Sequence, residues 1–267
     1  MSQQKPRNPL PEFKHPIDRL LWVMARLRDP EGGCPWDLAQ DFKTIVPYTI
    51  EEAYEVADAV DRGDMEDLKE ELGDLLLQSV YHAQMASENG HFDFNDVVEG
   101  ILDKMIGRHP HVFGEEQARS PDDVNRIWEG RKDAEKEGRE SALDGVTQGL
   151  PALLKAQKLQ KAAAKAGYVW PDTHHAFEKL EEEIAEFRAE LESGDKAAQE
   201  EEFGDLLFCL VNYGRMNGLK SEEALRKANV KFEKRFRGME SDLKKDGHTD
   251  LETLPLDTWL TYWKRQK

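Results

Sequence analysis

The sequence predicts an all-α protein built from two tandem helical-bundle repeats. The main observation is an acidic pattern, Glu-Glu-x-x-Glu followed by Glu-x-x-Asp, that occurs twice in the same register. Apolar residues recur at helical spacing around both copies, and no stretch alternates with period two for long enough to predict a sheet. Each acid has its counterpart 131 positions later: Glu52 and Glu183, Glu55 and Glu186, Glu71 and Glu202, Asp74 and Asp205. The acids therefore belong to a duplicated unit and do not merely reflect an acidic composition.

The duplication extends beyond the acids. Gly63-Asp64 matches Gly194-Asp195 at the same offset, and a basic pair further along, Lys104 and Arg108, matches Lys231 and Arg235 at an offset of 127. The shorter offset places a small insertion or deletion in the connection before the basic pair, where loops tolerate one.

Length and composition fit two helical domains. The 267 residues suffice for two domains of ordinary size, and 39% hydrophobic with 34% charged residues favours narrow apolar stripes on solvated helices. We expect a disordered, proline-rich arm, an N-terminal domain, a charged linker and a C-terminal domain, over residues 1–16, 17–114, 115–149 and 150–267.

The charge balance and the two cysteines limit the classes of function. A formal net charge of −17 argues against a nucleic-acid binder, because such proteins carry basic surface. No apolar run approaches the ~20 residues of a membrane span, and the N-terminus does not resemble a signal peptide. Cys34 and Cys209 lack the spacing of a disulfide framework or zinc site. We expect a soluble, cytoplasmic protein with reduced thiols and no membrane partner.

Each expected helix has local signals for its ends. The first, over 17–28, has a stripe of apolar residues and ends before a Gly-Gly-Cys-Pro turn. Gly63 and Gly194 suit a left-handed helix stop, and Asp64 and Asp195 suit the N-cap of the helix that follows. Each copy therefore contains a tight helical hairpin. The remaining helices are expected over 44–60, 64–87 and 95–108, and in the second copy over 173–191, 196–216 and 221–243.

The hairpin geometry predicts a metal site in each copy. Positions three apart lie on nearly the same face of a helix, so Glu52 pairs with Glu55, and Glu71 with Asp74. Four carboxylates at the junction of antiparallel helices repel one another unless a divalent cation lies among them. Oxygen ligands favour Mg²⁺ or Mn²⁺ over zinc. The second copy offers the same four ligands, Glu183, Glu186, Glu202 and Asp205.

The alternative is that these acids are solvated on exposed helix faces, which is the commoner state of a single glutamate. Two acids argue against it, because Asp74 and Asp205 lie beside the most apolar runs of each copy, over 75–77 and 206–208. We expect these acids to be carried into buried surroundings, where a bare carboxylate is costly.

Basic residues follow the acids in each copy. Lys231, Lys234, Arg235 and Arg237 form a basic cluster. Lys231 and Arg235 are four residues apart, so both could reach one phosphate tail held by metal ions, and Lys104 with Arg108 is placed similarly in the first copy. The alternative is ordinary helix-surface pairing with nearby glutamates. Trp36 and Trp170, each in a turn before an acidic helix, are expected to be core residues rather than surfaces for stacking on a nucleobase.

Together these motifs resemble the MazG family of all-α nucleoside triphosphate pyrophosphohydrolases, in its tandem-domain form. The resemblance covers nearly the whole chain. Besides the acids it includes DRLL at 18–21, LRDPEGGCPWD at 27–37, RHPHVF at 108–113, LPAL at 150–153 and KFEKRF at 231–236.

The resemblance implies Mg²⁺-dependent hydrolysis of ribo- and deoxyribonucleoside triphosphates to monophosphate and pyrophosphate, by a cytoplasmic homodimer. It implies that the C-terminal copy is the main catalytic one and that its four acids bind the metal. Lys231 and Arg235 match phosphate-contacting residues, and Trp259 lies near a tryptophan at the nucleotide. A lysine expected before the second acid pair is replaced by Ala198.

The residues leave two questions open. Either Glu182 or Glu202 could be the base that takes a proton from water. The alternative function is a metal-dependent nucleotide-binding or helical scaffold protein without turnover, since one copy of a tandem pair often loses activity.

Overall fold

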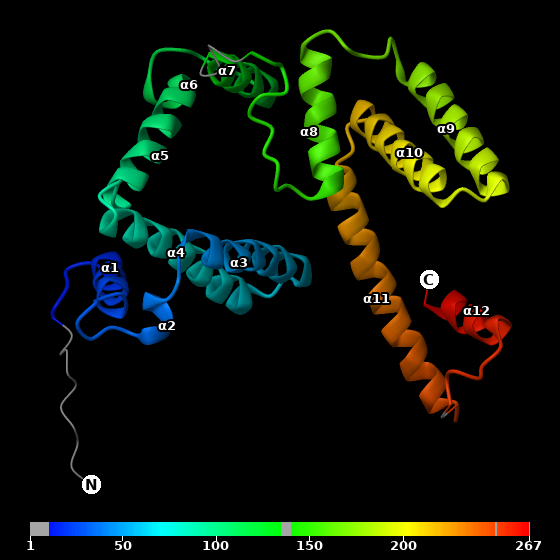
Figure 1. Cartoon of the computed structure of the whole chain (residues 1–267), viewed down its shortest axis with the longest axis horizontal. Helices are drawn as coiled ribbons and strands as arrows, with labels where there is room; N and C mark the ends of the chain where they lie inside the picture. Colours follow the sequence, from blue (N-terminus) through cyan, green and yellow to red (C-terminus); the bar gives the residue numbers. More distant parts are fainter. Residues whose placement is uncertain (1–10, 135–139, 249, 267) are drawn as a thin grey trace. The chain divides into compact units, whose positions relative to one another are not determined.

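The computed structural model describes residues 11–134, 140–248 and 250–266, which form twelve α-helices and no strand (Figure 1). The all-α prediction is confirmed. Residues 1–10 of the expected disordered arm lie outside the described residues, and residues 11–15 precede the first helix without regular structure. In these parts of the chain no helix combines the length and apolar character that a membrane span needs.

The chain divides into two compact units, Met1–Glu137 and Gly138–Lys267. The division falls inside the segment expected as a linker, yet part of that segment is helical and packs on the first unit. The predicted domain limits stay a prediction. The first unit contains α1 (Pro16–Leu27), α2 (Pro35–Leu38), α3 (Phe42–Arg62), α4 (Met65–Glu88), α5 (Phe94–Arg108), α6 (Pro110–Phe113) and α7 (Pro121–Ala134).

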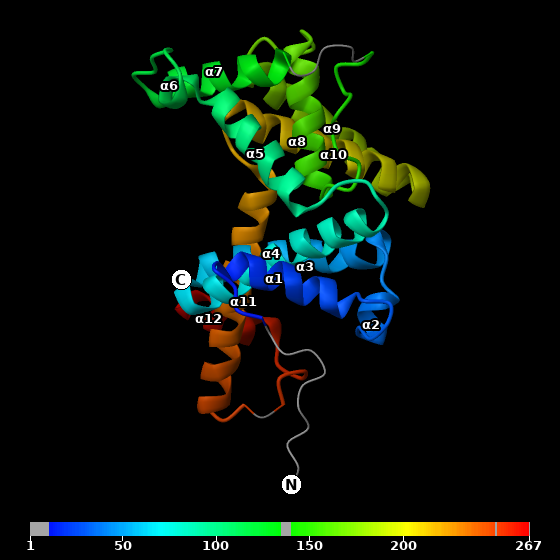
Figure 2. The same cartoon turned by 90° about the vertical axis from the view of Figure 1, so that its left-hand side faces the viewer.

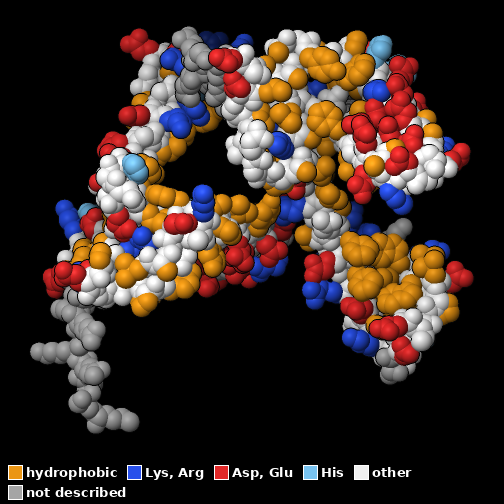
Figure 3. All heavy atoms as spheres, in the orientation of Figure 1, with side chains coloured by type: hydrophobic (Ala, Val, Ile, Leu, Met, Phe, Trp, Pro, Cys, Tyr) orange, Lys and Arg blue, Asp and Glu red, His pale blue; other side chains and the backbone are white. Residues whose placement is uncertain are grey.

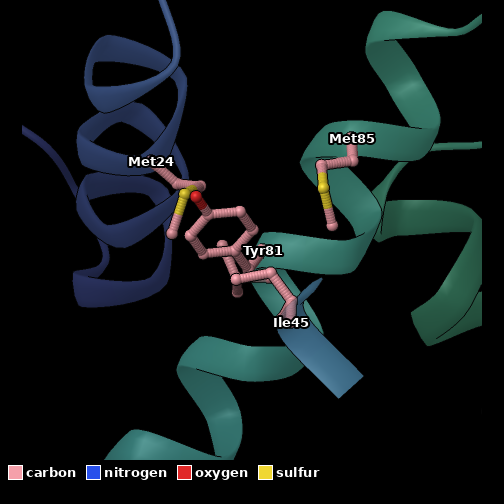
Figure 4. Packing of buried hydrophobic residues seen from close by; sticks show 5 residues of the cluster. Met24, Ile45, Tyr81 and Met85 are labelled. Atoms are coloured by element: carbon pink, nitrogen blue, oxygen red, sulfur yellow. The ribbon is translucent and has the colours of Figure 1, made fainter. Parts of the chain in front are cut away.

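The core of the first unit lies where α1 packs on the α3–α4 hairpin. Figure 4 shows Met24 of α1 beside Ile45 of α3 and Tyr81 and Met85 of α4. All four side chains are buried, and Tyr81 also donates a hydrogen bond of 3.0 Å to the carbonyl of Asp37. This packing holds α1 against the α3–α4 hairpin.

The second unit repeats this plan. Helix α8 (Ala152–Lys165) packs on the hairpin of α9 (Thr173–Ser193) and α10 (Lys196–Met216), as α1 packs on its own hairpin. Gln160 of α8 donates a 2.7 Å hydrogen bond to the carbonyl of Phe208 on α10, which holds the two helices together.

The last two helices of the second unit form a separate cluster. Helix α11 (Ser221–Lys245) contacts α8 and α10 and continues to α12 (Leu256–Arg265), which lies beside its C-terminal part (Figures 1 and 2). Met239, Leu243 and Tyr262 are buried there among aromatic side chains that include Trp259 and Trp263.

The predicted hairpin signals are confirmed. Gly63 and Gly194 end α3 and α9 in the left-handed conformation, with φ of 68° and 78°. The Asp64 carboxylate accepts a hydrogen bond from the backbone N–H of Asp67, and Asp195 accepts from Ala197 and Ala198. These turns set the register in which the two acidic faces meet.

Two expectations about burial are wrong. Asp205 is exposed and Asp74 is only half-buried, because the apolar residues beside them, such as Leu76 and Leu207, lie on faces of α4 and α10 that the chain leaves open. The tryptophans expected in the core are exposed as well. Trp36 is 52% exposed, with its ring edge-on to Tyr48, and Trp170 is 39% exposed.

Candidate functional site

The second unit brings three of its predicted ligands together. Glu183, Glu186 and Glu202 each offer a carboxylate oxygen within 4.8 Å of the others. Glu183 and Glu186 are three positions apart on α9, and the hairpin turn places Glu202 of α10 opposite them. Glu183 is only 5% exposed. Three carboxylates this close suit a hard divalent cation.

The fourth predicted ligand, Asp205, lies next to this group rather than within it. Burial and the negative charges of Glu186, Glu183 and Asp205 together raise the pKa of Glu202 above its ordinary value. Asp205 also lines a cavity that Glu183 borders. The four acids therefore share one electrostatic environment, in which the charges of the other three disfavour the ionised form of Glu202.

The first unit has the same arrangement. Glu52, Glu55 and Glu71 offer oxygens within 4.8 Å of one another. Burial and the charges of Asp74 and Glu55 raise the pKa of Glu52, and burial and the charge of Glu55 raise the pKa of Glu71. The duplicated acids thus form a duplicated group, with Asp74 again beside it.

A lysine that was not predicted completes the acidic group of the second unit. The Lys179 ammonium lies 2.7 Å from Glu182 Oε1, 2.9 Å from Glu183 Oε1 and 3.9 Å from Glu186 Oε2. Hydrogen bonds to Glu182 and then Glu183 raise the pKa of this lysine. Its spacing of three and four residues before the two glutamates is the signal that could have revealed it.

The two candidate bases differ in position. Glu202 is a member of the three-acid group, whereas Glu182 lies outside it, with its exposed carboxylate held by Lys179. The carboxylate of Glu182 is therefore not one of the three that could bind a cation together.

A cavity of about 600 Å³ adjoins the acids of the second unit. Its lining combines aromatic residues from the loop before α9 and from α10 with aliphatic residues of α8 and with charged residues of α9 and α10. Figure 3 shows the acidic side chains gathered over α9 and α10. A site with this lining suits a ligand that has a flat apolar part and an anionic part. The lining residues that matter here are Tyr168, Trp170, Phe208, Lys179, Glu183 and Arg215.

The predicted basic residues lie on other surfaces. On α11, Lys231 and Lys234 are exposed and the Arg235 guanidinium lies 5.5 Å from the centre of the Trp263 ring. Trp259 stacks on Phe236, with ring centres 5.5 Å apart. The residues that line the cavity include none of Lys231, Lys234, Arg235 and Trp259. Their predicted contact with phosphate stays a prediction.

The corresponding pair of the first unit is arranged similarly. Lys104 on α5 is exposed, and the Arg108 guanidinium lies 5.1 Å from the centre of the Trp128 ring. The alternative of pairing on the helix surface holds for Arg237 of α11, which donates a 2.9 Å hydrogen bond to Glu233. Lys104 and Arg108 likewise remain predicted contacts.

Comparison with known proteins matches both acidic hairpins. The family model described as the MazG nucleotide pyrophosphohydrolase domain matches residues 40–113 and 172–238. These stretches contain all eight predicted acids and both basic pairs, whereas Trp259 lies outside them.

Related proteins share nearly the whole chain. A nucleoside triphosphate pyrophosphohydrolase of Escherichia coli is 49% identical over 255 residues, 94% of this chain and 97% of that protein. The nucleoside triphosphate pyrophosphohydrolase/pyrophosphatase MazG of Thermotoga maritima is 43% identical over 252 residues, 94% of this chain and 95% of its own. Bacillus subtilis YabN, an uncharacterized protein, is 42% identical over 95% of this chain and 52% of its own length. Because the family domain is present twice and the Escherichia coli and Thermotoga maritima relatives are matched over nearly their whole length, the chain belongs to the MazG nucleotide pyrophosphohydrolase family.

Proposed function

We propose that the protein hydrolyses nucleoside triphosphates, both ribo and deoxyribo, to nucleoside monophosphate and pyrophosphate with Mg²⁺ as cofactor. The observation that carries this proposal is the group of Glu183, Glu186 and Glu202 beside an aromatic-lined cavity. The names of the Escherichia coli and Thermotoga maritima relatives support the same reaction.

The acids of the second unit are the proposed metal ligands. Glu183, Glu186 and Glu202, joined by Asp205, offer only oxygen atoms, which suits Mg²⁺ or Mn²⁺. The raised pKa of Glu202 reflects burial and the negative charge of its neighbours, and a cation would neutralise that charge. Bound there, the metal would neutralise triphosphate charge and lower the pKa of a water molecule. Glu52, Glu55, Glu71 and Asp74 are the matching ligands proposed for the first unit.

A carboxylate near the metal must accept the proton of the attacking water. Glu182 and Glu202 remain the two candidates, and the geometry favours Glu182. It lies one residue from a buried ligand but outside the three-acid group, so metal binding leaves its oxygens available. The Lys179 ammonium, 2.7 Å away, holds that carboxylate in place.

The cavity is the proposed place of the nucleoside. Its volume of about 600 Å³ lies in the range of small-molecule sites. Trp170, Tyr168 and Phe208 offer ring faces, and stacking on aromatic rings tolerates every base. This composition supports a broad choice of nucleoside triphosphates.

Two further parts of the proposal concern partners and location. Lys231, Lys234, Arg235 and Trp259 are proposed to contact the nucleotide, with Lys104 and Arg108 as their first-unit counterparts. The exposed apolar side chains of Phe232 and Leu256 on the last two helices support a homodimer, because such surface is usually covered. The two free cysteines fit a cytoplasmic location.

Product analysis tests the reaction. The purified protein is incubated with each common ribo- and deoxyribonucleoside triphosphate, with Mg²⁺ or with chelator, and products are separated by anion-exchange chromatography. We expect monophosphate and pyrophosphate in equal amounts, and only with metal. Intact triphosphate under all conditions would favour a nucleotide-binding or scaffold protein, and diphosphate with phosphate would contradict the site of cleavage.

A further inference from the structure

The Lys179 ammonium occupies the place where a cation would compensate the acids of the second unit. It contacts Glu183, the most buried acid of the group, at 2.9 Å and lies 3.9 Å from Glu186. Its side chain is 29% exposed and also lines the cavity. One monovalent cation therefore already partly neutralises carboxylates that would otherwise repel one another.

The first unit has a different neighbour at this position. Tyr48 stands four residues before Glu52, as Lys179 stands four residues before Glu183, and it is exposed with its ring against Trp36. The partner of Glu52 from the facing helix is the neutral amide of Gln78, which donates a hydrogen bond of 3.4 Å. Within the described residues, no lysine or arginine is recorded in an ion pair with Glu52, Glu55 or Glu71.

We propose that Lys179 is a built-in counterion, so that a divalent cation binds the second-unit acids only in exchange for the ammonium, whereas the first-unit acids bind it without exchange. The inference rests on the proposed metal role of both acidic groups. The ammonium must leave Glu183 before that carboxylate can ligate, and its attraction to Glu183 and Glu186 is lost in the exchange.

The exchange lowers the metal affinity of the second unit relative to the first. Two contacts of one partly exposed lysine with carboxylates correspond to about a tenfold difference in affinity. The exchange also gives the metal-free second unit a compensated set of acids, which the first unit lacks.

Titration with Mn²⁺, followed by the electron paramagnetic resonance signal of the free ion, measures this difference. Each unit is isolated in the full chain by removing one ligand from the other. In the Glu52→Gln background, which leaves the second-unit site, we expect Lys179→Met to tighten Mn²⁺ binding about tenfold. Lys179→Arg keeps the charge and is the matched control, with affinity close to that of the parent.

The reverse substitution tests the first unit. In the Glu183→Gln background, Tyr48→Lys is expected to weaken Mn²⁺ binding about tenfold relative to Tyr48→Met, which removes the ring without adding a charge. Should Lys179→Met fail to fold, as judged by circular dichroism, the Tyr48 pair decides the matter alone.

The outcomes separate the inference from the proposed function. If the parent proteins bind Mn²⁺ but neither Lys179→Met nor Tyr48→Lys changes the dissociation constant in the stated direction, the counterion exchange is wrong and the proposed hydrolase stands. If neither unit of the unaltered protein binds Mn²⁺, the metal part of the proposed function fails together with the exchange.

Discussion

The two units carry the same three glutamates in the same register, but their surroundings differ. In the first unit Glu52 meets the Gln78 amide, and in the second unit Glu183 meets the Lys179 ammonium beside an aromatic cavity. Cys209 stands where the first unit has Gln78, and burial and the charge of Glu183 raise the pKa of its thiol to about 11. The same three glutamates therefore lie in two different surroundings, an amide in the first unit and an ammonium beside a cavity in the second.

Removing one ligand from each unit should give the largest contrast. We expect Glu183→Gln to lower kcat for nucleoside triphosphate hydrolysis about 100-fold, because it removes the buried member of the group beside the cavity. Glu52→Gln, the same change in the first unit, should lower kcat less than about tenfold. Steady-state pyrophosphate release measures both, and equal losses would remove the functional distinction between the units.

The two tryptophans before the acidic helices should also differ. Trp170 lines the cavity, so Trp170→Ala should reduce kcat/KM about tenfold or more through lost stacking on the base. Trp36 packs edge-on against Tyr48, and Trp36→Ala should leave kcat/KM nearly unchanged. A larger effect at Trp36 would place the nucleotide in the first unit.

The pH dependence of stability tests what the units share. Burial and like charges raise the pKa of Glu202 and of Glu71 in the folded protein. A raised folded-state pKa means that ionisation opposes folding at neutral pH, and this loss is recovered as pH falls through the folded pKa. With chelator present, Glu202→Gln should be more stable than the parent at pH 7, and the gain should shrink toward pH 5.

The matched variant is Glu71→Gln, which should behave in the same way in the first unit. Urea unfolding at several pH values gives the free energies of unfolding. A gain that stays constant or grows as pH falls would show that repulsion among these acids does not limit stability.

The smallest effect should be equal in the two units. Asp64 and Asp195 cap equivalent helices, so replacing either by alanine should cost about 1 kcal/mol of stability. Urea unfolding of the single variants measures each loss of stability. We expect the two losses to be equal, in contrast to the unequal losses of activity expected for Glu183→Gln and Glu52→Gln. A clear difference between the two caps would indicate that the hairpins are not equivalent in backbone structure.

Much of the hairpin follows from the sequence, because its signals are local. Gly63 with Asp64 and Gly194 with Asp195 specify a helix end and a new start, and acids three residues apart share a face. Because the hairpin turn sets the acidic face of one helix opposite that of the next, three glutamates come together in each unit. These predictions needed no knowledge of how the helices pack on the rest of each unit.

The surroundings of the acids could not be predicted in this way. Lys179 lies four residues before Glu183, which is the spacing of a helical ion pair. The first copy has Tyr48 at the matching position, so a comparison of the two copies does not identify this lysine. The cavity wall combines a loop residue, Trp170, with Phe208 of α10, and only tertiary packing brings them together. The exposure of Trp36 and Trp170 could not be predicted, because a residue in a turn has no periodic pattern around it that indicates whether its side chain points to the core or to solvent.

The most direct test is a crystal structure of the full chain with Mg²⁺ and a nucleoside triphosphate analogue whose α–β bridging oxygen is replaced by a group that resists hydrolysis. The account predicts a cation on Glu183, Glu186 and Glu202, with the base in the cavity against Trp170. A nucleotide bound at Glu52, Glu55 and Glu71 alone, or away from both acidic groups, would contradict it.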